Sequence, residues 1–186
     1  MMRSVWRTII LATCLVLPAF PAHAEPRSAG CILALYPRPA DATALSVPGG
    51  EPADDLHLTL VNLGVDARPG AEAELRRRLG DLTAAPASPV EAQVFGHAVI
   101  NPNSVEFNPS VVYIIGDSPG LNPLRQQVIA LAGDVYRLPG QHEPWLPHVT
   151  AFYGQADTSL SYTGPVVFDR IGLKCDTETT YFALGH

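Results

Sequence analysis

The sequence predicts an α+β fold within a single domain, and three observations lead to this expectation. Short apolar stretches bounded by glycine and proline recur along the chain, as is typical of buried strands. Two segments with apolar residues at helical spacing separate groups of these strands, which is an α+β pattern. The chain has 186 residues, of which 47% are hydrophobic. That is enough for one packed core and too little for two ordinary domains.

The N-terminus has the features of a secretory signal peptide, which we expect to span residues 1–24. Two arginines precede an uncharged apolar run, and Ala22-His23-Ala24 offers small residues around a cleavage site. Two alternatives stay open. One is a membrane anchor, although the run is shorter than the roughly 20 residues that a spanning helix needs. The other is a lipoprotein modified at Cys14. Cleavage would leave a secreted or periplasmic domain of residues 25–186.

The first half of this domain is expected to hold two strands, a long loop and a helix. The loop is rich in proline, glycine and alanine. The helix has leucines at helical spacing, with acidic residues early and Arg76, Arg77 and Arg78 later, which is the order that a helix dipole favours. We interpret the three arginines as a solvated helix face. In chain order, the expected elements are the strand Cys31–Tyr36, the loop Pro37–Asp55, the strand Leu56–Leu63 and the helix Ala71–Leu82.

The second half is expected to be richer in strands. One helix follows the turn at residues 116–117, with core positions at Leu121, Leu124, Val128 and Leu131. An irregular stretch, Pro139–Pro147, comes after it. The expected strands are Val90–Ile100, Ser104–Phe107, Val111–Ile115, His148–Tyr153, Val166–Leu173 and Thr179–Leu184.

The charge balance limits the partners. Lys and Arg together number 12 against 18 Asp and Glu, which gives a net charge of −6, and Lys174 is the single lysine. A protein that follows a long nucleic-acid backbone carries a basic stripe, so we expect no such partner. Small anionic ligands held by a few fixed groups remain compatible with this composition. We expect a monomer with no membrane contact once the signal has been removed.

Cleavage would leave two cysteines, Cys31 near the new N-terminus and Cys175 near the C-terminus. Thiols tend to oxidise in an export compartment, which favours a disulfide between them. The alternative is two separately buried thiols. Sequence alone does not show whether the two Cα atoms approach closely enough for a bridge.

Two short segments repeat a polar pattern on expected strands. They are His57-Leu58-Thr59 and His148-Val149-Thr150. Because side chains alternate along a strand, the histidine and the threonine of each segment share one face. If the two strands lie side by side, two imidazoles and two hydroxyls converge. One histidine can then accept a proton and the other can donate one, while the hydroxyls hold phosphoryl oxygens.

The alternative interpretation is two strand histidines that are merely satisfied by neighbouring groups. The longer runs Glu51–Gly64 and Pro147–Gly154, however, resemble the two signatures of the 2H phosphoesterase superfamily. That group includes the 2′-5′ RNA ligase and cyclic nucleotide phosphodiesterase proteins. The resemblance implies two similar α+β lobes related by a pseudo-twofold axis, with antiparallel sheets and a cleft between them. It also implies that His57 and His148 are catalytic and that Thr59 and Thr150 bind phosphate.

Other polar and aromatic residues are weaker candidates. Tyr36 and Tyr153 stand at strand ends, and Trp145 lies in the loop before the second motif, so each is a possible substrate contact; packing is the alternative. His142 and Glu143 lie in the same loop as Trp145, and His97 is a strand residue that we expect to be satisfied by a hydrogen-bond partner. These histidines show no tight ligand spacing, so we expect no metal site and no cofactor.

These expectations combine into a function. The chain is expected to be a metal-independent phosphodiesterase that opens small 2′,3′-cyclic phosphates, on a nucleotide or an RNA end, by acid and base catalysis with two histidines. One alternative is cleavage or ligation of 2′-5′ phosphodiester bonds in oligonucleotides. Another is a non-catalytic module that binds a phosphate or nucleotide. Sequence does not assign which histidine is the acid and which is the base.

Overall fold

The computed structural model describes residues 30–65, 69–84, 88–103, 108–116, 118–154 and 159–185. The expected signal peptide and the expected strand Ser104–Phe107 lie outside the described residues. Within them, no helix is long and apolar enough to cross a membrane.

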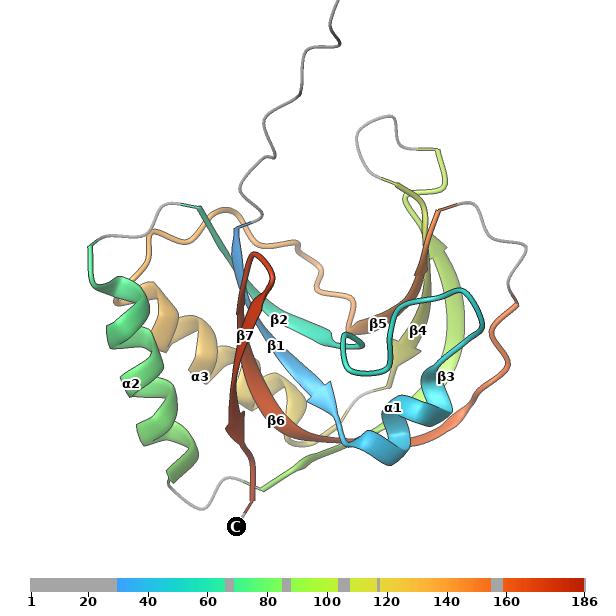
Figure 1. Cartoon of the computed structure of the whole chain (residues 1–186), viewed down its shortest axis with the longest axis horizontal. Coiled ribbons are helices and arrows are strands. Elements are labelled where there is room, and N and C mark those ends of the chain that lie inside the picture. Colours follow the sequence, from blue (N-terminus) through green and yellow to red (C-terminus); the bar gives the residue numbers. More distant parts are fainter. Residues whose placement is uncertain are drawn as a thin grey trace, which may run out of the picture.

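The described residues form seven strands and three helices (Figure 1). The strand pairings are all antiparallel, so the α+β prediction is confirmed. In chain order the elements are β1 (Cys31–Pro37), α1 (Pro39–Leu45), β2 (Leu58–Gly64), α2 (Ala71–Ala84), β3 (Val90–Ile100), β4 (Ser110–Ile115), α3 (Leu121–Gly133), β5 (His148–Tyr153), β6 (Gly164–Cys175) and β7 (Glu178–Ala183).

One curved sheet contains all seven strands, in the order β1-β2-β5-β4-β3-β6-β7. The long strand β6 joins its two halves. The start of β6 pairs with β3, and the remainder pairs with β1 and β7. Because β6 meets both β3 and β1, the strands β1, β2, β5, β4, β3 and β6 form a closed circuit.

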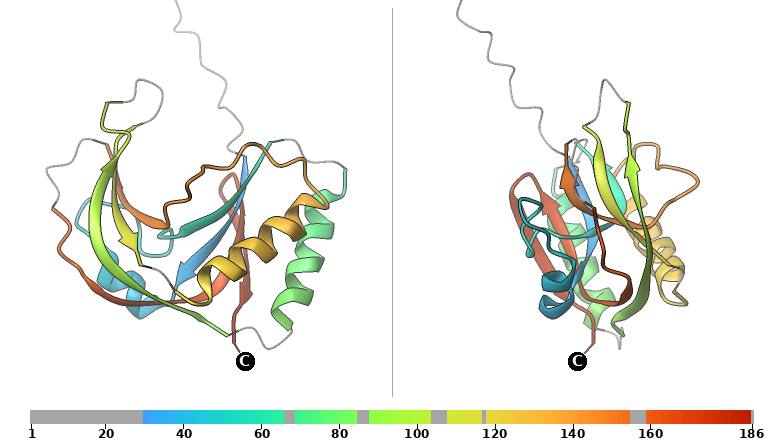
Figure 2. Two further views of the ribbon diagram at one scale, coloured as in Figure 1. Left: turned by 180° about the vertical axis from the view of Figure 1, so that it is seen from behind. Right: turned by 90° about the vertical axis from the view of Figure 1, so that its right-hand side faces the viewer.

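The two halves repeat one arrangement. β1-α1-β2 and β4-α3-β5 are each a strand, a helix and a second strand with a His-x-Thr motif at its start. The helices α2 and α3 lie beside β1, β2 and β7, whereas α1 lies near β3 and the start of β6 (Figures 1 and 2). α3 packs against β2, so a helix from the second half covers a strand of the first. This repetition agrees with two similar halves related by a pseudo-twofold axis.

The core lies on one side of the sheet, where alternate strand residues point toward the helices. Leu33, Leu35, Leu58, Leu60 and Val149 are among the residues that are almost fully buried there. Removing this much apolar surface from water is the main favourable contribution to the fold. The opposite side of β2 and β5 is therefore left for polar side chains.

The expected loop Pro37–Asp55 was wrong in part, because it contains the helix α1. Pro39 occupies the first turn, where its fixed φ angle suits a helix and its missing N–H is not needed. Ala42 and Leu45 are three residues apart and both are buried. Asp41 accepts a hydrogen bond at 2.8 Å from the backbone N–H of Val167 on β6, which attaches the helix to the sheet. The proline-rich composition concealed this single short helix.

The arginines of α2 lie in a network of surface ion pairs, as the solvated-face interpretation expects. Arg76 pairs with Glu72, and Arg77 and Arg78 both pair with Glu74. Arg78 also reaches Asp134 just after α3, at 2.9 Å. The three guanidinium groups are thus engaged by carboxylates.

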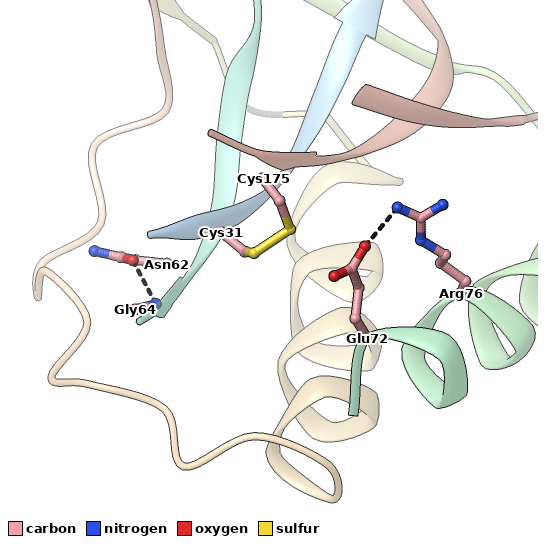
Figure 3. The surroundings of a disulfide bond; sticks show 6 residues. All are labelled: Cys31, Asn62, Gly64, Glu72, Arg76 and Cys175. Atoms are coloured by element: carbon pink, nitrogen blue, oxygen red, sulfur yellow. Dashed lines mark hydrogen bonds and ion pairs between the residues drawn. A yellow bond between two sulfur atoms is a disulfide. The ribbon is translucent and has the colours of Figure 1, made fainter. Parts of the chain in front are cut away.

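A disulfide joins Cys31 at the start of β1 to Cys175 at the end of β6 (Figure 3). The two Cα atoms are 4.2 Å apart, and the bond spans a sequence separation of 144 residues. The bridge therefore ties the first strand of the described chain to its penultimate strand, next to the β6–β7 hairpin.

Candidate active site

The two motif strands meet at one residue pair. Leu58 of β2 lies opposite Val149 of β5 in antiparallel register. This register sets His57 across from Thr150 and Thr59 across from His148. The two histidines are then diagonal neighbours, a relationship that typically separates residues by about 7–8 Å. We call the surface formed by these two histidines and two threonines the motif face.

Burial confirms which way the motif residues point. Leu58 and Val149 are completely buried, whereas the four motif-face residues are only partly buried. Alternation along the two strands explains this division. His57 directly precedes β2 rather than lying within it, because β2 begins two residues later than expected.

The neighbouring strands flank the motif face with buried apolar residues. Thr59 is in register with Ala34 of β1, and Thr150 is in register with Val112 of β4. His148 is in register with Ile114 of β4. Ala34, Val112 and Ile114 are buried but do not belong to the main core, as expected if they lie on its opposite side. The polar groups of the motif face thus have buried apolar side chains as neighbours on the same side of the sheet.

Each motif histidine is held in the same way. The Nδ1 atom of His57 is 2.6 Å from the carbonyl oxygen of Asp55, and that of His148 is 2.7 Å from the carbonyl oxygen of Leu146. A carbonyl only accepts hydrogen bonds, so each Nδ1 carries the proton and donates it. The Nε2 atom of each ring is therefore the one left for proton transfer.

The environment of His57 favours its neutral form. Burial lowers the pKa of His57 below its ordinary value of 6.5, and the electrostatic effects of Lys174 and His148 act in the same direction. The hydrogen bond to the Asp55 carbonyl and the Asp55 carboxylate oppose this shift but do not cancel it.

Lys174 is a charged neighbour of the site that the sequence did not reveal. Its Nζ atom lies 3.0 Å from the carboxylate of Asp55, two residues before His57. The ion pair links β6 to the segment whose carbonyl holds the His57 ring. No sequence pattern connects two residues so far apart, because β6 meets this segment only in the folded sheet.

Tyr36 lies beside the motif face, but its side chain is not exposed to a substrate in this structure. Its ring centroid is 5.6 Å from that of His57. The side chain is completely buried, and this burial raises the pKa of Tyr36 to about 12. Tyr36 thus contributes a neutral aromatic surface beside His57.

The structure places Trp145 against a buried arginine. Arg125 of α3 is 4% exposed, and its guanidinium carbon lies 4.5 Å from the centre of the Trp145 ring. Its Nε atom donates a hydrogen bond to the carbonyl of Leu60, and its Nη2 atom contacts the carboxylate of Glu143 at 3.1 Å. Arg125 therefore fastens the loop before His148 to the first motif strand. It was not predicted from the sequence, although it lies one helical turn after Leu121.

The same loop makes a second attachment to β2. The side-chain amide of Gln141 accepts a hydrogen bond from the N–H of Asn62 and donates one to the carbonyl of Asn62, both at 2.9 Å. This pattern imitates the pairing of a neighbouring strand. The irregular stretch between α3 and β5 thus binds the backbone of β2 at Asn62, beyond the point where β2 pairs with β5.

A bulge in β5 decides where Tyr153 points. Thr150 pairs with Val112 and Phe152 with Val111, so Ala151 is an extra residue on this strand. Ala151 and Phe152 both pack toward the core. Tyr153 then returns to the side of the sheet that carries Thr150, where it is 52% exposed. It lies at the end of the strand, beyond the motif residues.

The remaining histidines do not join the motif face. His97 is in register with Tyr113, a core residue, and therefore lies on the opposite side of the sheet. Its Nε2 atom is 2.8 Å from the carbonyl oxygen of Tyr162, a satisfied contact of the kind expected. His142 is exposed in the loop before β5. The described residues contain no group of three or more His, Cys, Asp or Glu side chains that could hold a metal ion.

Comparison with known proteins gives the family. The model of the 2′-5′ RNA ligase superfamily matches residues 39–176. The protein TT0787 of Thermus thermophilus has a similar structure, with a TM-score of 0.55 and 20% identity over 83% of this chain and 94% of that one. LigT of E. coli in complex with 3′-AMP gives a TM-score of 0.53 and 17% identity over 85% and 96%.

No curated protein sequence gave a match. At identities this low, the structural likeness shows the fold, whereas the family model covers well over half of the chain and both motif strands. The resemblance to the 2H phosphoesterases is thereby confirmed, and the chain belongs to the 2′-5′ RNA ligase superfamily.

Proposed function

We propose that the chain is a metal-independent phosphodiesterase that opens the 2′,3′-cyclic phosphate of a nucleotide or RNA end. Membership in the superfamily supports an activity on phosphoesters in general. The more specific proposal rests on one observation. Two imidazoles, each held at Nδ1 by the carbonyl two residues earlier, lie on one face with both Nε2 atoms left for proton transfer.

The proposal assigns His57 as the general base. Its lowered pKa keeps the imidazole neutral near pH 7, so that Nε2 can accept a proton from water. The water oxygen then attacks phosphorus, and the bond from phosphorus to one ribose oxygen breaks. His148 donates its Nε2 proton to that leaving oxygen. The product is a ribonucleoside monophosphate, and exchange of protons with solvent restores both histidines.

The threonine hydroxyls complete the site. Thr59 stands across from His148, and Thr150 stands across from His57, which follows from the register at Leu58 and Val149. A phosphoryl group between the diagonal histidines would thus have a hydroxyl donor on each side. Hydrogen bonds aimed at oxygens that gain charge in the transition state lower the barrier to the reaction.

A chelator experiment tests this function. Hydrolysis of 2′,3′-cyclic AMP by the purified, oxidised protein is measured after exhaustive treatment with EDTA. A panel that includes a 2′-5′-linked diadenylate is run in parallel. We expect turnover of the cyclic nucleotide that is insensitive to EDTA. Loss of activity that zinc, manganese or magnesium restores would contradict the mechanism, and turnover of the 2′-5′ linkage alone would contradict the substrate.

We further propose that the protein works outside the cytoplasm. The Cys31–Cys175 disulfide supports this, because disulfides persist mainly in oxidising compartments. The intact mass of the protein recovered from the producing cells tests the proposal. We expect a chain that begins at Glu25. A chain that retains Met1, or one with lipid on Cys14, would contradict the expected processing.

A further inference from the structure

A group of side chains beside His57 has no part in the proton transfers. It consists of Tyr36 on β1, Arg170 and Gly172 on β6, and Tyr181 on β7, and we call it the aromatic platform. Tyr36 is in register with Arg170, and Gly172 is in register with Tyr181. Cross-strand partners point to the same side of a sheet. Because Tyr36 contacts His57, the whole platform lies on the side of the motif face.

The platform is built around a glycine in the middle of a strand. A Cβ atom at Gly172 would collide with the ring of Tyr36 and would press on the methyl group of Thr179 at 3.0 Å. Glycine within a strand loses packing and costs backbone entropy, so it often marks a close approach by another group. Here it lets the buried Tyr36 ring lie across β6.

Tyr181 packs against Tyr36, and its own ring is partly exposed. Its centroid is 5.0 Å from that of Tyr36, and the two rings are nearly perpendicular at 89°. The side chain of Tyr181 is 46% exposed, whereas Tyr36 is completely buried. The guanidinium of Arg170 lies 5.2 Å from the Tyr181 ring centre and 6.0 Å from that of Tyr36. An exposed aromatic ring is thus held in place by a buried ring and a cation.

The charges of this region select the class of ligand. Arg170 contacts the carboxylate of Asp169 at 2.9 Å, and Lys174 contacts that of Asp55 at 3.0 Å. Both cations are therefore already paired with carboxylates. The platform offers an aromatic surface rather than an uncompensated positive charge, which suits a flat heterocycle better than a second phosphate.

We propose that the aromatic platform is the subsite for the nucleobase, with Tyr181 as the residue on which the base stacks. Successive ring centroids lead from His57 through Tyr36 to Tyr181 in steps of 5.6 and 5.0 Å. A nucleotide whose phosphate lies at the motif face can place its base over this path. This inference rests on the proposed function, since it names the part of that substrate that the enzyme selects: nucleoside cyclic phosphates over cyclic phosphates without a base.

The experiment compares two substrates and three variants. The substrates are 2′,3′-cyclic AMP and glycerol 1,2-cyclic phosphate, which has the same five-membered ring without a base. The variants are Tyr181→Leu, Tyr181→Phe and the control Phe95→Leu, an exposed aromatic residue of β3. Stacking on an aromatic side chain is worth enough for Tyr181→Leu to raise KM for the nucleotide about 5- to 100-fold. We expect kcat to change little, and the base-free substrate to be unaffected.

Tyr181→Phe keeps the ring and should keep the KM of the parent protein, as should Phe95→Leu. An equal loss on both substrates, or no loss with Tyr181→Leu, would overturn the inference. Calorimetric binding of 3′-AMP to the same proteins separates this inference from the proposed function. If the parent protein turns over neither substrate but its affinity for 3′-AMP still falls with Tyr181→Leu, the proposed reaction fails and the base subsite stands.

Discussion

Leu58 and Val149 face each other across the pairing of β2 and β5, and both side chains are completely buried. The pseudo-twofold axis that relates the two motifs passes through this residue pair. Each residue is the middle member of a His-x-Thr segment, so its burial on the core side presents its two polar neighbours on the other side. The geometry of the motif face therefore depends on two apolar residues that do no chemistry.

Leu58→Ala should destabilise the protein by about 2–5 kcal/mol, because it leaves a cavity beneath the motif strands. Chemical denaturation followed by fluorescence measures the free energy of unfolding. Val65→Ala is the control, since Val65 is 68% exposed and its truncation should have almost no effect. A loss below about 1 kcal/mol with Leu58→Ala would mean that β2 is not anchored by this contact.

His57→Ala and His148→Ala should each reduce turnover of 2′,3′-cyclic AMP by about 10²- to 10⁴-fold, the range for losing a general acid or base. Both side chains are only partly buried, so thermal melting should stay near that of the parent protein. His97→Ala is a matched control, because His97 is a strand histidine on the other side of the sheet. A variant at His57 or His148 with normal turnover and a much lower melting temperature would identify a structural histidine instead.

The lowered pKa of His57 predicts how activity depends on pH. The general base must be unprotonated, so kcat/KM should fall on the acid side with a midpoint below 6.5, the ordinary value for histidine. Initial rates at low substrate concentration across the pH range give this midpoint. A midpoint above 6.5 would exclude His57 as the base.

The same shift also affects stability. Between the lowered pKa and 6.5, the unfolded chain binds a proton at His57 that the folded protein does not. The free energy of unfolding should therefore fall as pH drops through this window, and the loss is complete below it. Denaturation of the parent protein and His57→Gln, from about pH 7.5 to about pH 5, isolates this contribution. The variant should lose less stability on acidification than the parent.

Reduction of the Cys31–Cys175 disulfide should lower the free energy of unfolding by about 4–5 kcal/mol, the chain-entropy value for a loop of this size. Thermal melting with and without reductant measures the effect. The double variant Cys31→Ser and Cys175→Ser should melt at the lower temperature in both conditions. If the parent protein melts at the same temperature with and without reductant, and thiol labelling confirms reduction, the bridge does not constrain the unfolded chain.

Local patterns were sufficient to predict most of the strands and the motif residues. β3 and β5 have the expected bounds, because their apolar residues and flanking turns are continuous in the sequence. The helix α1 was missed because proline usually indicates a loop. Only the structure shows that Pro39 lies in the first turn of a helix, where proline is tolerated.

Contacts between distant segments could not be predicted from the same patterns. The ion pair of Lys174 with Asp55 depends on the neighbouring arrangement of β6, β1 and β2. Arg125 looks like a surface residue of an amphipathic helix, yet it is buried against the Leu60 carbonyl and Trp145. The orientation of Tyr153 depends on the extra residue in β5, and no local sequence pattern predicted this bulge.

The strand that joins the two halves comes late in the chain order of the described elements. β6 spans residues 164–175 and is the neighbour that β1 and β3 have in common. Until β6 leaves the ribosome, the sheet has no closing strand and Cys31 has no partner in Cys175. The sheet of a nascent chain therefore stays open until β6 has been synthesised. This order of events agrees with the proposed export, in which a polypeptide crosses a membrane unfolded and completes its sheet and its disulfide on the far side.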